Sequence, residues 1–136
     1  MADLIYDSFK EHMGDGTIGL DSHTFNVALF TDAHTPDATD SSYTGLTGEV
    51  ANGNGYTTGG AALGSVTWGQ TSGTATFDAA DASWSAATFT ARYAIIYDAT
   101  SAGIELVCLF NFGADKIVTA STFLLTFNAS GIFTLA

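Results

Sequence analysis

The chain has very few basic residues. Lys10, Arg92 and Lys116 are the only ones among 136 residues, against 14 carboxylates, so the formal net charge is −11. A nucleic-acid backbone or an anionic membrane would be repelled rather than neutralised, and neither is expected as a partner. No apolar run approaches the roughly 20 residues of a spanning helix. The opening "MADLIYDSFKEH" lacks the basic region and apolar core of a signal peptide, which predicts synthesis in a cytoplasm without export.

Cysteine and charge are also scarce. Cys108 is the single cysteine, so an intrachain disulfide is excluded, and its place in "LVCLF" predicts a small buried hydrophobe. Charged residues make up 12% of the chain, about half the usual share. The surface is therefore expected to be rich in Ser, Thr, Ala and Gly, and part of it to be covered by copies of the chain or by a partner.

The N-terminal segment has the spacing of one short helix. Ile5, Phe9 and Met13 fall on one stripe, Asp3 can cap the start, and Gly14 can end it. This pattern predicts a helix over residues 3–13.

The rest of the chain has the pattern of short strands. Alternating, β-branched and aromatic stretches predict strands at 24–31, 64–68, 74–78, 89–98, 104–112, 122–128 and 132–135. The strand at 89–98 is apolar on both faces towards its end and is expected to be central. Turns at 99–103 and 128–131 are expected to join antiparallel neighbours, and the polar stretch 32–45, with the single proline Pro36, predicts a surface loop.

These features define the expected fold. They predict one domain over residues 1–136 that is mainly β, an antiparallel β-sandwich or jelly-roll-like barrel with one short N-terminal helix.

The glycine-rich stretch "GNGYTTGGAALG" (53–64) invites comparison with phosphate-binding loops. A dinucleotide fingerprint needs a third glycine at Thr58, and a nucleotide P-loop needs Lys and then Ser or Thr at Ala61 and Ala62. Both patterns also continue into a helix, whereas "GSVTW" predicts a strand. We therefore interpret the stretch as a turn segment anchored by a buried Tyr56, whose glycines permit positive φ.

Signatures of metal or cofactor binding are missing from the sequence. The three histidines form no H-x-x-x-H pair, and no second cysteine is present for a zinc cluster; they are His12, His23 and His34. The carboxylates at 15–21 and 78–81 lie near turns without EF-hand spacing. Aspartates also occupy turns because they bond their own backbone. No metal or cofactor is expected; a structural calcium ion at these turns is the alternative.

Catalytic motifs are missing too, and no enzymatic activity is expected. There is no G-x-S-x-G elbow and no S-x-x-K. The sequence leaves open a glycosidase-type pair among Glu11, Glu49 and Glu105, since such carboxylates need only be close in space. Trp68 and Trp84 could stack on sugar rings, but tryptophans in strands more often belong to the core.

Several segments, taken in order, resemble one family. They are "YDSFKEHM", "FNVALFT", "HTPD", "GYTTGGAAL", "FDAADASWSAATFTARYAIIYD", "FNFG" and "TFNASGIFTL". This order of turns and strands resembles small virion structural proteins of tailed bacteriophages, over nearly the whole chain. The resemblance implies a non-enzymatic protein, most like a capsid decoration (cement) protein that bridges major capsid subunits on the outer shell and stabilises the head against internal DNA pressure.

The resemblance also implies partners and a location. These are the major capsid protein and further copies of the chain, as a trimer in preference to a dimer, on the capsid surface of a virion made in the host cytoplasm. Interaction specificity tends to lie in surface loops. The candidate contact segments are therefore the loop 31–48 and the N-terminal helix, with Phe9, His34, Pro36 and Tyr43 as candidate partner-binding residues. A neck, tail or fibre component and a carbohydrate-binding receptor-recognition module are the alternatives.

Overall fold

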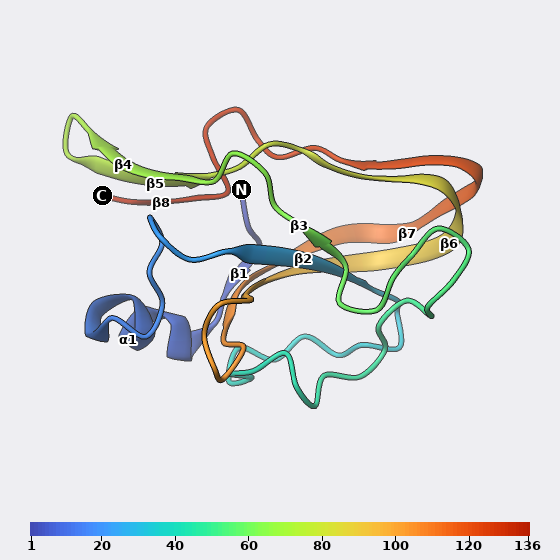
Figure 1. Cartoon of the computed structure of the whole chain (residues 1–136), viewed down its shortest axis with the longest axis horizontal. Helices are drawn as coiled ribbons and strands as arrows, with labels where there is room; N and C mark the ends of the chain where they lie inside the picture. The colour runs from blue at the N-terminus through green and yellow to red at the C-terminus, as the bar shows by residue number, and fades with distance from the viewer.

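The computed structural model describes residues 1–136 as two antiparallel sheets and one helix (Figure 1). The elements are β1 (Leu4–Ile5), α1 (Asp7–Asp15), β2 (Phe25–Phe30), β3 (Ala61–Ala62), β4 (Thr67–Thr71), β5 (Thr74–Asp78), β6 (Ala82–Asp98), β7 (Leu106–Leu125) and β8 (Phe133–Leu135). The predicted fold class, mainly β with antiparallel sheets in a sandwich-like arrangement and one short helix, is confirmed.

The larger sheet has the strand order β1-β7-β6-β2-β3, and the smaller sheet the order β4-β5-β8. The predicted central strand is confirmed, because the end of β6 lies between β7 and β2 and residues 94–98 are all buried. The core also contains Cys108, Tyr56 and Trp84, as the sequence predicted for each. The single helix, α1, is too short to span a membrane.

β6 and β7 form one long ribbon, and their predicted lengths were wrong. β6 begins at Ala82, not Phe89, and residues 113–121 join two predicted strands into one. The sequence is misleading here because the ribbon contains irregularities that resemble strand ends. Ala86 and Ala120 have positive φ next to register shifts, where bulges carry the ribbon onward.

The ribbon bends between the two layers of the sandwich. The register passes from Ala91↔Lys116 to Tyr93↔Asn111, so four residues of β7 face one residue of β6. Figure 1 shows both strands turning together at the right of the view, from the lower layer into the upper one. We call residues 82–91 and 117–125 the outer limb of the ribbon, and the remainder its inner limb.

The helix is shifted from its predicted bounds. Leu4 and Ile5 are not helical but pair with Leu109 and Cys108 of β7. Extended backbone at Tyr6 marks the start of α1, and Gly16, with φ of 85°, ends it. The predicted cap, Asp3, instead accepts a hydrogen bond from the Asn111 N–H at 2.8 Å.

Two strand assignments near the glycine-rich stretch and the C-terminus also need correction. The strand predicted at 64–68 begins only at Thr67, after the two-residue β3. The turn near Asn128 exists, but it does not join antiparallel neighbours. β8 pairs with β5 in the smaller sheet, whereas β7 belongs to the larger one. Turn-forming residues predict that the chain changes direction, but they do not predict which strand the following strand pairs with.

Candidate interaction surface

Residues 31–60 connect β2 to β3 without a helix or a named strand. This long connection passes below the larger sheet in Figure 1 and is fixed by isolated bridges, Phe30↔Glu49 and Ser42↔Glu105. Connections of this length are usually functional or disordered. This one is ordered by a polar cluster centred on a single carboxylate, Glu49.

Glu49 accepts three hydrogen bonds from different parts of the chain. The Tyr43 hydroxyl donates to Oε2 at 2.5 Å, and the Tyr56 hydroxyl and the Gly59 N–H donate to Oε1, each at 2.7 Å. Burial first, and the hydrogen bond to Glu49 second, raise the pKa of both tyrosines well above their ordinary range. The Tyr56 hydroxyl also accepts from the Leu29 N–H at 3.0 Å, which connects the cluster to β2.

The glycine-rich stretch therefore already faces an anion from its own chain. The Gly59 N–H points at the Glu49 carboxylate, and the Tyr97 hydroxyl donates to the Gly59 carbonyl at 2.6 Å. Gly60, with φ of 80°, lies so close to β2 that a Cβ would overlap the Val27 carbonyl. Residues 53–64 therefore form the turn segment that the sequence predicts, and hydrogen bonds from Tyr97 and to Glu49 hold it beside β2.

The four candidate partner-binding residues do not form one surface. Phe9 is 2% exposed and packs edge-on against Phe133, and His34 is 4% exposed beside the ring of Phe30. Pro36 and Tyr43 are half-buried in the loop. In this conformation burial leaves only Pro36 and Tyr43 within reach of a partner.

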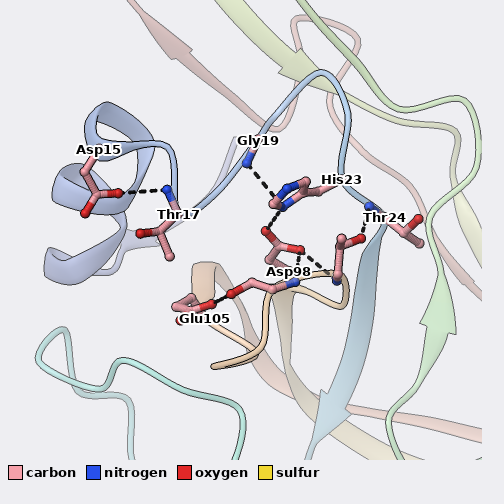
Figure 2. Close-up of polar contacts among 9 residues, drawn as sticks. Asp15, Thr17, Gly19, His23, Thr24, Asp98 and Glu105 are labelled. Atoms are coloured by element: carbon pink, nitrogen blue, oxygen red, sulfur yellow. Dashed lines mark hydrogen bonds and ion pairs between the residues drawn. The ribbon is translucent and has the colours of Figure 1, made fainter.

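A second polar cluster joins the segment before β2 to the β6–β7 turn (Figure 2). Asp98, fully buried at the end of β6, accepts from the Thr100 N–H at 2.9 Å and the Ser101 N–H at 3.1 Å. Its other oxygen lies 2.5 Å from Nδ1 of His23. An acceptor at that distance assigns the proton to Nδ1, so the longer 3.3 Å contact from the Gly19 N–H to the same nitrogen contributes little.

Orientation of an imidazole by a buried carboxylate also occurs in hydrolytic triads. Here the remaining nitrogen, Nε2 of His23, has no hydrogen bond to a hydroxyl or thiol of the chain. Ser101 instead bonds Glu105 next to it, and the Cys108 thiol is fully buried, which raises its pKa. The His23–Asp98 contact therefore links the segment before β2 to the end of β6.

The carboxylates near the predicted turns bond the backbone. Asp15 accepts from the Thr17 N–H, Asp78 from the Ala79 N–H and Asp81 from the Phe127 N–H. No three His, Cys, Asp or Glu side chains lie close enough together to hold a metal ion. Trp84 is buried, and Trp68 is half-buried against Phe133.

Charge divides the molecule into two regions. Residues 1–49 carry nine of the fourteen carboxylates, whereas the segments 50–77, 82–91 and 117–136 carry no charged residue. The uncharged layer comprises β4, β5, β8 and the outer limb, and Asp78 at the end of β5 is the one charge in these elements. The outer limb exposes small polar side chains and two large apolar ones, Ile117 and Leu124, which are 75% and 59% exposed.

We call the rest of the molecule the acidic layer. It comprises α1, β1, β2, β3, the inner limb and the connection 31–60.

Comparisons of the chain with protein-family models, curated proteins and solved structures find no match.

Sequence reasoning missed Glu49 and Asp98 as structural centres. Each is a single acidic residue without a motif. The donors to Glu49 lie six to ten positions away with no regular spacing, and His23 lies 75 positions from Asp98. The charge-free segments are visible in the sequence, but the placement of 82–91 and 117–125 in one layer with β4, β5 and β8 depends on the bend of the ribbon.

Proposed function

We propose that the chain is a non-enzymatic structural protein of a tailed-bacteriophage particle, a capsid decoration protein that bridges major capsid subunits on the outer shell. The observation that carries the proposal is the uncharged layer on a chain of net charge −11. Burial of small, neutral side chains against another protein removes few charges from water and so has a low desolvation cost.

The mechanism would be mechanical. Each copy would contact two or three neighbouring subunits and oppose their separation under internal DNA pressure. A standard interface buries roughly 800 Å² per partner. Simultaneous attachment at several such contacts raises the effective affinity far above that of one contact. The acidic layer would face outward into solvent, because burial of its charges against the shell would carry a high desolvation cost.

The resemblance of the sequence to small virion proteins supports the phage assignment. The proposed partners are the major capsid protein and further copies of the chain, with a trimer preferred to a dimer. Of the four candidate partner-binding residues, Pro36 and Tyr43 remain accessible; they lie in the acidic layer, where they would contact neighbouring copies of the chain rather than the shell.

A carbohydrate-binding role has less support. Carbohydrate-binding sites need exposed aromatic rings beside polar groups. Trp84 instead packs against Phe123, with ring centroids 5.9 Å apart, and Trp68 packs against Phe133, with ring centroids 6.0 Å apart. A neck, tail or fibre position is the nearest alternative, because such components can also be small and β-rich.

The test is carried out on the phage that encodes the chain. Particles with and without the protein are imaged by cryo-electron microscopy and then heated at low salt while DNA release is measured. We expect regular copies on the shell, and earlier DNA release from particles that lack them. Equal stability together with an empty shell would refute the decoration role, and density at the neck or tail would favour the alternative.

A further inference from the structure

β4 is the longest regular strand edge that the fold leaves open. The outer strands of the larger sheet, β1 and β3, have two residues each, and β8 has three. Residues 82–91 of β6 and 117–125 of β7 also lack an outer neighbour, but register shifts with positive φ at Ala86 and Ala120 interrupt them. β4 pairs with β5 without a register shift over all five of its residues and has no neighbour on its other side.

This edge lacks the usual protection. Proteins cover open edges, shorten them, or place charge, proline or bulges on them. The β4 sequence "TWGQT" contains neither charge nor proline, and four of its five residues are exposed. An edge of this kind favours pairing with another strand.

The hairpin geometry shows which backbone groups are free. Ser72 and Gly73, with φ of 51° and 86°, form a two-residue turn between Thr71 and Thr74. These angles are typical of a type I′ turn, which closes on a hydrogen-bonded pair, and such pairs alternate along an antiparallel ladder. Therefore Trp68 and Gln70 direct their N–H and C=O groups away from β5.

We infer that β4 pairs antiparallel with β4 of a second copy, across a twofold axis at Gly69. The free groups of Trp68 then bond those of Gln70 in the second copy, and the reverse, so all four groups on each strand find partners. The two small sheets join into one continuous sheet of six strands. At the axis the two Gly69 residues face each other as a pair without hydrogen bonds, where Cα atoms approach to about 4.5 Å.

A second copy is a better occupant than an unrelated strand for two reasons. The free groups are placed symmetrically about Gly69, so the strand is complementary to itself. Copies of a chain with net charge −11 repel each other, and β4 lies in the long segment 50–77 without charge, where that repulsion is weakest. The inference rests on the self-association within the proposed function but replaces the preferred trimer by a twofold dimer contact. It is tested on the isolated chain.

Disulfide trapping is the suitable measurement. Pairing of five residues buries much less than the roughly 1,600 Å² of a standard interface, so the association is weak in solution. A Cβ at Gly69 meets no atom within 4 Å, and its φ is not positive, so cysteine fits there. Opposed Cα atoms at the axis lie within the range that a disulfide spans. The native Cys108 is fully buried and does not compete.

The experiment compares oxidised Gly69→Cys with two matched variants on the same exposed side of the strand. We expect Gly69→Cys to form disulfide dimers at least about tenfold faster than Thr67→Cys or Thr71→Cys alone, whose cysteines would be roughly 14 Å from their own copies. A mixture of Thr67→Cys and Thr71→Cys should form the mixed dimer, because these positions oppose each other. Equal rates for all three single variants would overturn the inference.

A second change tests the hydrogen bonds themselves. Gln70→Pro removes one free N–H, and since β5 does not use that group, an edge strand tolerates the change. In the Gly69→Cys background it should slow cross-linking to the rate of Thr71→Cys with the fold intact by circular dichroism. Unchanged cross-linking would refute pairing through β4. Dimers in solution without copies on a particle would support this inference and refute the proposed function. Copies on a particle without β4 dimers in solution would support the proposed function and refute this inference.

Discussion

The two layers of the molecule use their polar groups in different ways. In the acidic layer, the half-buried Glu49 and the buried Asp98 bind backbone N–H groups and the side chains of other segments. In the uncharged layer, small polar side chains face solvent, and the backbone of β4 keeps an unpaired edge. The comparison indicates that one layer fixes the conformation of the chain while the other is available for contacts.

The largest difference between the layers is expected at two glycines. Gly60→Ala in the acidic layer should destabilise the fold by about 4 kcal/mol or more, because the new Cβ overlaps the Val27 carbonyl at a positive φ. Gly69→Ala in the uncharged layer should change stability by less than about 1 kcal/mol, since its Cβ meets nothing. Urea unfolding measures both, and equal losses would contradict the comparison.

The next largest effect is expected at the His23–Asp98 contact. Asp98→Ala should cost about 1–3 kcal/mol, because it leaves two backbone N–H groups and the His23 ring without their acceptor. Asp98→Asn keeps one carbonyl acceptor and should cost clearly less. Thermal unfolding of the two variants decides whether the lost acceptor, and not the change in volume, sets the cost.

High pH should lower the stability of the whole chain through the tyrosines of the acidic layer. Burial raises the pKa of Tyr6 and Tyr56 above the ordinary value of 10.0, so the folded chain retains protons that the unfolded chain releases. The free energy of unfolding should therefore be unaffected below about pH 9 and fall above pH 10 by about 1.4 kcal/mol per pH unit for each such tyrosine. Urea unfolding between pH 8 and 11 measures this slope.

Tyr6→Phe is the matched control for the alkaline slope. The Tyr6 hydroxyl is buried without a hydrogen-bond partner, so its removal should not lower stability at neutral pH. Above pH 10 the free energy of unfolding should then fall less steeply, by about 1.4 kcal/mol per pH unit, which is the contribution of one tyrosine. An unchanged slope would show that Tyr6 ionises equally in both states.

The smallest effect is expected on the outer limb. Leu124→Ala should change the free energy of unfolding by about 0.5 kcal/mol or less, because the side chain is 59% exposed. Leu29→Ala in β2, which removes a fully buried side chain, should cost about 2–5 kcal/mol. A large loss from Leu124→Ala would mean that the outer limb contributes to the fold as strongly as β2 does.

Local patterns in the sequence predicted the elements but not their neighbours. The predicted strand 74–78 coincides with β5, and the buried states of Cys108 and Trp84 were also predicted. The prediction separated the two halves of β7 because Gly113 and the polar residues after it resemble a turn. Cross-strand pairing with β6 overrides that local preference.

The polar clusters could not be predicted for a related reason. Glu49 binds a residue six positions before it and others seven and ten positions after it, and His23 meets Asp98 across 75 positions. Helices and strands impose periods that a sequence reveals, whereas loop contacts have no period. The sequence places the four candidate partner-binding residues in a loop and a helix. It does not show what those segments pack against, and that packing buries Phe9 and His34.

The bent ribbon also affects how the chain folds and unfolds. β6 and β7 are joined by a short turn, so their pairing closes a small loop and can form early, before the distant contacts of β2 or β8. Because the same two strands run through both layers, neither layer has a core of its own that could persist after the other is lost. We therefore expect the chain to unfold in a single cooperative transition, with amide hydrogen exchange slowest along the inner limb.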